Sequence, residues 1–308
     1  MNNANPLVSI LIPVYKRENV VKRAINSALK QTYRNIEIIC VDNDSPDNTF
    51  NTLLEYQEKD NRIKVYKQEK NVGPVRNWMT CLEKSSGEYI KFLWSDDEIS
   101  EDCIEKLIAP FIACNDIGLS YSKVDIYVED EILKSKYQLG KTGKYKSIYF
   151  IKIAAGLILG KTVPVSPGCA LLKREVVEKY LKVNYENDKG LDFSRYGAGN
   201  DSMLFYGACN DYKYIFYVDE ALSNFYGEKD SFTITNKLED YYEYVLEMFL
   251  KHNSKKFKFF TEKRMLLKTN FRNIEIKFIP FFIEYKIRLK FRRLRNFIIK
   301  KIKKQCEC

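Results

Sequence analysis

Histidine is nearly absent from this chain, and long apolar runs are missing altogether. His252 is the only histidine among 308 residues, and its lysine-rich surroundings predict a surface position, not a metal ligand. No segment approaches the roughly 20 continuous apolar residues that a membrane-spanning helix requires. The first residues lack a basic region followed by an apolar run, so we expect no secretory signal.

Paired cysteine motifs and glycine-rich nucleotide motifs are missing as well. The eight cysteines form no CxxC pair, and several stand inside apolar runs, which is typical of buried, reduced thiols in a cytosolic protein. Cys306 and Cys308 are expected to belong to a frayed terminus. The absence of GxGxxG and GxxxxGK[ST] disfavours a nicotinamide oxidoreductase and a P-loop NTPase.

The net charge of +10 comes from one end of the chain. Residues 277–304 hold 11 Lys or Arg and one acid, Glu284; subtracting these from totals of 51 and 41 leaves 40 basic and 40 acidic residues elsewhere. A nucleic-acid-binding protein more often carries basic residues across its folded face. The distribution therefore indicates a neutral enzyme with a basic appendage and no nucleic-acid partner.

Strands and helices alternate along the first hundred residues. Apolar runs bounded by polar clusters predict buried strands over 8–12, 36–41, 63–66 and 89–93. Helical patterns over about 19–31, 48–58 and 74–84 separate them. This alternation predicts an α/β fold, with a mostly parallel sheet flanked by helices. Ligands bind beyond the carboxyl ends of the strands in such sheets.

The pattern changes after residue 100. We predict strands over 117–128, 214–218 and 221–226, and helices over 148–159 and 200–209. Beyond residue 237 the sequence predicts helices rich in Lys, Phe and Tyr. The chain is therefore expected to divide into a ligand-binding α/β domain over 1–230 and a helical, basic, amphipathic region over 231–308.

Polar loops follow the four N-terminal strands and are expected to line one edge of the sheet. The chemistry that fits them is binding of a base, a ribose and a diphosphate. Tyr15 would stack on a nucleobase, and Asp42 would accept hydrogen bonds from a ribose or a base N–H. Asp96 and Asp97 would hold a divalent cation, Mn²⁺ or Mg²⁺, which bridges the diphosphate.

Six short pieces stand in order between residues 8 and 97: VSILIPVY, SALKQTY, EIICVDNDS, NVG with a following RN, SGEYI and LWSDD. Together they resemble the family-2 glycosyltransferases, which have the GT-A fold. The resemblance implies Asp42 at the nucleotide base, Arg76 near the phosphates and Asp96 as the metal carboxylate. Trp94 stands where the family pattern often has the first Asp of Asp-x-Asp-Asp, which removes one ribose or water contact.

A further piece, GAGNDS over 197–202, resembles the loop that carries the family's general base at a helix start. Asn200 replaces the usual Glu, and Asp201 is retained. The resemblance implies that Asp201 takes the proton of the acceptor hydroxyl as it attacks the anomeric carbon. One carboxylate opposite the leaving diphosphate predicts in-line displacement and inversion. Asp192 is the alternative base.

The expected reaction transfers a sugar from a nucleotide sugar, a UDP-sugar, to a growing surface glycan or a lipid-linked oligosaccharide. The expected donor-binding residues all lie in the loops after the first four strands. They are Pro13, Tyr15, Arg17, Asp42, Asp44, Asn71, Gly73, Arg76, Ser95 and Asp96.

Two other functions stay open from the sequence. A nucleotidyltransferase of similar fold would normally show a glycine-rich basic loop after the first strand. A catalytically inactive binding protein would be expected to lose its carboxylates. Purely structural roles are also open, because Asp is common in turns and at helix N-caps and Arg76 fits a helix surface.

Apolar residues recur at helical spacing near the C-terminus. They are Ile283, Ile287, Phe291, Leu294, Ile298 and Ile302. This stripe among basic residues predicts an amphipathic helix on an anionic membrane surface, and hence a cytoplasmic enzyme peripheral to the inner face of the cell membrane. Alternation over 285–292 also fits a strand, and the stripe also fits packing on the α/β domain or on a partner chain.

The tail generates the first prediction. We expect the full chain to pellet with anionic vesicles, because each cation near an anionic leaflet contributes about 1 kcal/mol. High salt, or deletion of the residues after 280, should release it, while the shortened chain still binds its donor. Sedimentation with vesicles and donor titration measure both. A shortened chain that is insoluble or unfolded would place the stripe in the core.

Overall fold

The computed structural model describes residues 5–128, 131–158, 161–227, 238–253 and 256–257. Ten strands in these ranges form one mixed sheet in the order β3-β2-β1-β4-β9-β6-β10-β5, with β7 beside β6 and β8 beside β10. The strands are β1 (Val8–Val14), β2 (Ile36–Asp42), β3 (Ile63–Lys67), β4 (Tyr89–Phe92), β5 (Glu98–Ile99), β6 (Ile117–Val128), β7 (Glu131–Lys136), β8 (Gly143–Lys146), β9 (Ala170–Lys173) and β10 (Tyr214–Tyr226).

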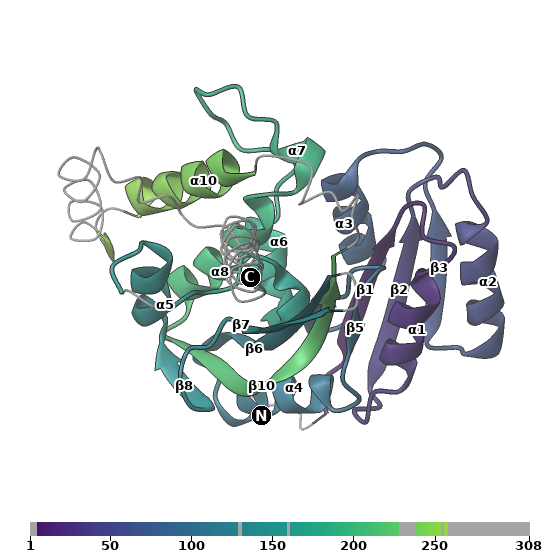
Figure 1. Ribbon diagram of the computed structural model, residues 1–308, viewed down its shortest axis with the longest axis horizontal. Helices are drawn as coiled ribbons and strands as arrows, with labels where there is room; N and C mark the ends of the chain where they lie inside the picture. The colour runs from purple at the N-terminus through teal and green to yellow at the C-terminus, as the bar shows by residue number, and fades with distance from the viewer. Residues whose placement is uncertain (1–4, 129–130, 159–160, 228–237, 254–255, 258–308) are drawn as a thin grey trace, which may run out of the picture.

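Helices cover both faces of this sheet (Figure 1). They are α1 (Val21–Leu29), α2 (Thr49–Lys59), α3 (Pro74–Glu83), α4 (Cys103–Ala113), α5 (Ser147–Ala154), α6 (Arg174–Tyr180), α7 (Phe193–Tyr196), α8 (Asn200–Asp211) and α10 (Glu239–His252), with a 3-10 turn, η1 (Pro167–Cys169). The predicted α/β fold, with its helices flanking a sheet, is confirmed.

Side-chain alternation along β1 divides the core into two. Leu11 belongs to one hydrophobic cluster, and Ile10 and Ile12 belong to the other, because successive residues of a strand point to opposite faces. The cluster around Leu11 includes helical residues of α3, α5, α6, α7, α8 and α10. The cluster around Ile10 takes them from α1, α2 and α4. Each face is therefore sealed by helices, as buried parallel strands require.

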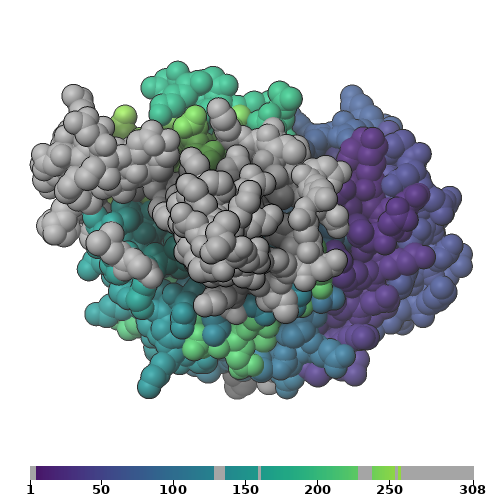
Figure 2. Space-filling model, viewed as in Figure 1, coloured from purple at the N-terminus to yellow at the C-terminus, as the bar shows by residue number. Residues whose placement is uncertain are grey.

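The four N-terminal strands are parallel. β1 pairs with β2 on one side and with β4 on the other, and β2 pairs with β3. Their carboxyl ends consequently meet at one edge of the sheet. In the space-filling view these strands and the helices between them (purple to blue) form one side of the molecule, and the elements from β6 onward (teal to green) form the other (Figure 2).

The second half of the sheet differs from the prediction at β10, and its strands β5, β7, β8 and β9 were not predicted. The two strands expected over 214–218 and 221–226 are one strand, β10, whose parallel pairing with β6 is irregular between Val218 and Ser223. The polar pair Asp219–Glu220 interrupts the apolar run there, but the extended backbone continues through the irregularity. β9 runs antiparallel between β4 and β6, and no local pattern in its residues specifies this pairing with strands distant in sequence.

The C-terminal region begins with a helix that packs on the body. α10 carries Glu239 and Asp240 in its first turn and Lys251 and His252 in its last, which matches the helix dipole. Its buried face, which includes Val245, lies in the same core cluster as residues of α8. The domain boundary near residue 230 stays a prediction, and the apolar stripe over 283–302 lies outside the described residues.

At the edge opposite the carboxyl ends, one buried carboxylate joins three strands. Glu37 of β2 accepts hydrogen bonds from Ser9 Oγ at 2.7 Å, Ser86 N at 2.5 Å, Gly87 N at 3.2 Å and Lys64 Nζ at 2.8 Å. Burial alone would raise the pKa of Glu37, but the hydrogen bonds from Lys64, Ser86 and Ser9 outweigh it and lower the pKa to about 2. Its ionised form is thus favoured by folding.

We expect Glu37→Ala to lower the free energy of unfolding by about 3 kcal/mol, since it leaves several buried donors without an acceptor. Because the pKa is depressed, Glu37's contribution is present above its ordinary value near 4.5 and is lost as the pH falls toward 2. Urea unfolding at pH 7 and pH 3 measures this difference. Glu55→Ala, on the exposed face of α2, is the matched control. If Glu37→Ala lowers the free energy of unfolding no more at pH 7 than at pH 3, this account is contradicted.

Candidate active site

The ends of β1 and β2 are joined through the buried carboxylate of Asp42. Its two oxygens accept hydrogen bonds from the Ser45 backbone N–H, at 3.0 Å, and from the Ser45 hydroxyl. The Ser45 oxygen in turn accepts from the Lys16 N–H at 2.9 Å. Asp42 therefore shapes the loop after β1 in this structure, as the turn role open from the sequence would have it. Its contact with a nucleotide stays a prediction.

Two non-glycine residues in these loops adopt left-handed backbone conformations. Lys16 has φ 54° and Asp44 has φ 60°. Such residues are uncommon, and they cluster at functional sites because the surrounding structure must hold them. Tyr15 beside them is 39% exposed, so its ring is accessible for stacking on a base. Asp44 Oδ1 lies 3.6 Å from Lys67 Nζ.

Asn43 joins the second loop to the third. Its side-chain oxygen accepts from the Val72 N–H at 2.9 Å, and its amide nitrogen donates to Asn71 Oδ1 at 3.1 Å. Asn71 Oδ1 also accepts from the Gly73 N–H at 3.0 Å, and Gly73 has φ 82°, which favours glycine. The structure therefore brings the predicted residues Asn71 and Gly73 beside the end of β2 through a residue that the sequence analysis did not select.

The acidic turn after β4 separates its two carboxylates. Asp96 is 20% exposed and lies 3.4 Å from Arg17 Nη2, while Arg23 of α1 donates to the Asp96 backbone carbonyl. The predicted residues Arg17 and Asp96 are thus brought together from the first and fourth loops. Ser95, which directly precedes Asp96 in the turn, is buried.

Asp97 points the other way, into the protein. It is buried, and its Oδ1 accepts from the Tyr226 N–H of β10 at 2.9 Å. Burial and the neighbouring charge of Asp96 raise the pKa of Asp97 well above its usual range, against the hydrogen bond from Tyr226 and the charges of Arg23 and Lys91. Asp97 therefore fixes the turn against β10, and its buried carboxylate faces the protein interior, whereas that of Asp96 is partly exposed.

No group of three or more His, Cys, Asp or Glu side chains within the described residues is arranged to hold a metal ion. A divalent ion held by one or two carboxylates together with substrate phosphates does not need such a group. Of the two predicted metal ligands, Asp96 fits this arrangement because it is partly exposed. Asp97 fits it less well, because burial and the Tyr226 N–H already engage it.

Asp201 stands at the start of α8 and is buried. Its Oδ1 accepts from the Gly199 N–H at 2.9 Å and the Ser202 N–H at 2.7 Å, and its Oδ2 accepts from the Tyr242 hydroxyl at 2.9 Å. Burial raises the pKa of Asp201 to about 7, and the hydrogen bonds from Tyr242, Ser202 and Gly199 act in the opposite direction. A carboxyl group with a pKa near 7 suits proton transfer at neutral pH.

Aromatic contacts connect the loop of Asp201 to the acidic turn. The rings of Trp78 and Trp94 lie 5.0 Å apart, and Trp94 donates from Nε1 to Ser166 Oγ at 2.8 Å. A Cβ on Gly197 would lie 2.1 Å from Trp78, so the backbone of the loop before Asp201 rests directly on this ring. Trp94, two residues before Asp96, therefore packs where the family pattern often has a carboxylate.

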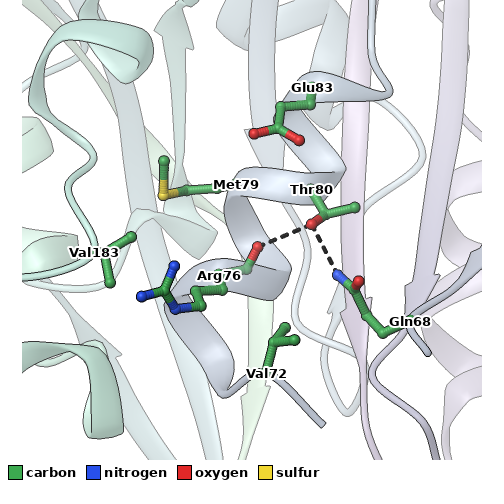
Figure 3. A pocket seen from close by; sticks show the side chains of 7 residues that line it. All are labelled: Gln68, Val72, Arg76, Met79, Thr80, Glu83 and Val183. Carbon is green, nitrogen blue, oxygen red and sulfur yellow. Dashed lines mark hydrogen bonds between the residues drawn. The ribbon is translucent and has the colours of Figure 1, made fainter. Parts of the chain in front are cut away.

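Arg76 and Asp192 are placed apart from this constellation. Arg76 lies on α3 and lines a pocket of about 250 Å³ with Met79, Thr80 and Val183 (Figure 3). In the described part of the chain, no hydrogen bond or ion pair joins it to Asp42 or Asp96. Asp192, the alternative base, caps α7 by accepting from the Ser194 N–H at 3.0 Å, and it is exposed.

Chemically, Arg17 can bind an anion beside the carboxylate of Asp96, and the buried carboxylate of Asp201 can accept a proton. Pro13, Tyr15, Arg17 and Asp96 occupy the edge where the parallel strands end. Asp201 stands at the start of α8, after the loop whose Gly197 packs on Trp78. Tyr242, Asn43 and Arg23 were missed by the sequence analysis, since nothing in their spacing distinguishes them from core or surface residues.

Comparison with known proteins gives one family. Residues 9–181 match the family model described as Glycosyl transferase family 2. An uncharacterised glycosyltransferase of Haemophilus influenzae is 42% identical over 101 residues, which are 33% of this chain and 40% of that protein. The UDP-Glc:alpha-D-GlcNAc-diphosphoundecaprenol beta-1,3-glucosyltransferase WfgD of Escherichia coli is 37% identical over 127 residues, 41% of this chain and 49% of that one.

The putative teichuronic acid biosynthesis glycosyltransferase TuaG of Bacillus subtilis is 32% identical over 130 residues, 42% of this chain and 51% of that protein. The chain thus spans about half or less of the length of these relatives. Among solved structures, TarS 1–349 of S. aureus in complex with UDP-GlcNAc shares the fold, with a TM-score of 0.64 and 18% identity over 88% of this chain and 76% of that one. None of the described helices is both long and apolar enough to cross a membrane.

Proposed function

Because the chain belongs to glycosyl transferase family 2, we propose that it is an inverting glycosyltransferase that moves a sugar from a UDP-sugar to a hydroxyl group of its acceptor. The observation that carries this proposal is Asp201, a buried carboxylate with a pKa of about 7 in the loop whose Gly197 packs on Trp78, the ring beside Trp94 of the acidic turn. Burial raises the pKa of Asp97 as well, so the value for Asp201 supports the proposal together with its place in the GAGNDS segment at the start of α8.

The chain's own residues account for the proton transfer. Each carboxylate oxygen has two lone pairs. Oδ1 of Asp201 uses both on the N–H groups of Gly199 and Ser202, while Oδ2 uses one on Tyr242. The remaining lone pair of Oδ2 accepts the proton of the acceptor hydroxyl as its oxygen bonds to the anomeric carbon. The bond from that carbon to the diphosphate breaks on the opposite side, which inverts the configuration.

The proposed donor is supported by two similar proteins. TarS, which shares this fold, has been crystallised with UDP-GlcNAc and with UDP, and the name of WfgD gives UDP-Glc as its donor. Tyr15, exposed after β1, would stack on the uracil ring, and Arg17 would face the diphosphate after leaving Asp96.

Asp96 would hold a divalent cation, Mg²⁺ or Mn²⁺, together with the donor's diphosphate. Its partly exposed carboxylate and its position at the edge of the sheet support this assignment. Such a cation would neutralise the charge that develops on the leaving diphosphate. Asp97 would support it from behind by fixing the turn against β10.

The proposed acceptor is a glycan or a lipid-linked oligosaccharide in surface polysaccharide or lipooligosaccharide synthesis. The names of TuaG and WfgD, which refer to teichuronic acid and to a diphosphoundecaprenol acceptor, support it. The enzyme would then work at the cytoplasmic face of the membrane, where the basic residues of 277–304 would attract it to anionic lipid.

The metal assignment predicts that EDTA abolishes transfer and that Mn²⁺ or Mg²⁺ restores it. Asp96→Ala should severely weaken donor binding or turnover, because a diphosphate leaving group needs its charge neutralised. Asp102→Ala, a carboxylate near the start of α4 paired with Lys106, is the matched control and should behave as the wild type. Full activity in EDTA would leave Arg17 and other cations to neutralise the charge.

The base assignment is tested with a panel of nucleotide sugars, first to find the donor that is bound or hydrolysed and then to measure transfer. Asp201→Asn should fold and bind that donor but lose about 10²-fold or more in turnover. Asp192→Asn, which alters only the cap of α7, should keep its activity. A panel without any bound or hydrolysed donor would sink the proposed function, whereas near-normal turnover of Asp201→Asn would move the base elsewhere.

A further inference from the structure

The carboxylate of Asp201 is completed by a residue far along the chain. The Tyr242 hydroxyl, in the first turns of α10, donates to Asp201 Oδ2 at 2.9 Å. Both side chains are buried, at 8% and 7% exposure. Tyr242 lies outside the segment 9–181 that the family model matches, as does Asp201 itself. The C-terminal region thus reaches the site through one hydrogen bond.

The two oxygens of Asp201 are held by different parts of the chain. The N–H groups of Gly199 and Ser202, next to it in sequence, hold Oδ1. Tyr242 is the side chain that holds Oδ2, the oxygen left with a free lone pair. The direction in which that lone pair points therefore depends on α10, while the position of Oδ1 depends on the start of α8.

α10 is fixed well enough to carry this role. Val245 packs against Gly199, where a Cβ would lie 2.8 Å from its methyl group, and Tyr241 packs edge-on to Phe193 with 5.3 Å between ring centroids. Tyr242 is therefore held by neighbours on both sides, in contact with the loop that carries the base.

We propose that Tyr242 is a positioning residue for the transfer reaction, which turns the free lone pair of Asp201 Oδ2 toward the acceptor hydroxyl and favours the ionised carboxylate. The inference rests on the proposed function, because it takes Asp201 to be the base. It assigns to α10, which lies beyond the segment 9–181 matched by the family model, a part in the chemistry of the site.

Three tyrosines of the described elements interact electrostatically with Asp201, which raises their pKa values. They are Tyr242 from α10, Tyr137 from the segment between β7 and β8, and Tyr185 from the segment before α7. The Tyr185 hydroxyl donates elsewhere, to the Tyr180 carbonyl at 2.7 Å. Loss of the Tyr242 hydroxyl therefore removes a donor that stabilises the charged carboxylate, while burial, which raises its pKa, stays.

The test compares Tyr242→Phe with Tyr241→Phe in the full chain. Each change removes one hydroxyl and keeps the ring, and Tyr241 is the matched control because its ring packs on Phe193 and Tyr196 instead. Two readouts are needed. One is the titration of the Asp201 carboxyl by ¹³C NMR, with its resonance assigned from its absence in Asp201→Asn. The other is the pH profile of kcat and KM for transfer.

For Tyr242→Phe we expect the Asp201 titration midpoint to move upward by about half a pH unit or more. The acid limb of the kcat profile should move with it, so that activity falls more at pH 6.5 than at pH 8.5, with the donor KM unchanged. Tyr241→Phe should match the wild type in both. Agreement of the two readouts supports the proposal.

An unchanged titration midpoint overturns the inference, and so does a midpoint that moves without any change in the pH profile, since Tyr242 would then only support the fold. Equal shifts in both tyrosine variants overturn it as well. Failure of the proposed function is recognised separately, because the wild type would then transfer no sugar or Asp201→Asn would turn over normally.

Discussion

The site depends on the parallel pairing of β1 with β2 and β4. This pairing places the ends of three strands at one edge, so that Asp42, Arg17 and Asp96, distant in sequence, meet within one group of loops. The opposite ends of the same strands are joined through Glu37, whose hydrogen bonds hold β1, β3 and the entry to β4 together. Glu37 thus fixes the edge of the sheet opposite the loops of the candidate site.

Three buried carboxylates in the site accept hydrogen bonds from three different kinds of partner. Asp42 is satisfied by Ser45 in its own turn, Asp97 by a backbone N–H of a distant strand, and Asp201 by two backbone N–H groups and one hydroxyl. The number of hydrogen bonds does not separate them by role, since Asp201 accepts three, Asp42 two and Asp97 one. Residue type alone does not separate catalytic acids from structural ones either.

The sequence predicted what is local and periodic. The four N-terminal strands and their helices carry strong apolar patterns, and the loops after them follow from the order of the chain. It did not predict β9, whose antiparallel partners are distant in sequence, or the continuity of β10 through Asp219. The bond between Asp201 and Tyr242 was beyond it because it depends on the packing of α10 over α8, and no pattern in either segment encodes that contact.

The antiparallel strand β9 between β4 and β6 has a consequence for how the molecule forms. β4 can pair with β1 as soon as residue 92 has left the ribosome, but its other edge stays open until residues 170–173 arrive. An unpaired strand edge invites pairing with other chains, and pairings between distant segments form slowly. The nascent α/β half therefore emerges with an exposed central edge, and a chaperone that shields strand edges would act on this protein before its sheet is complete.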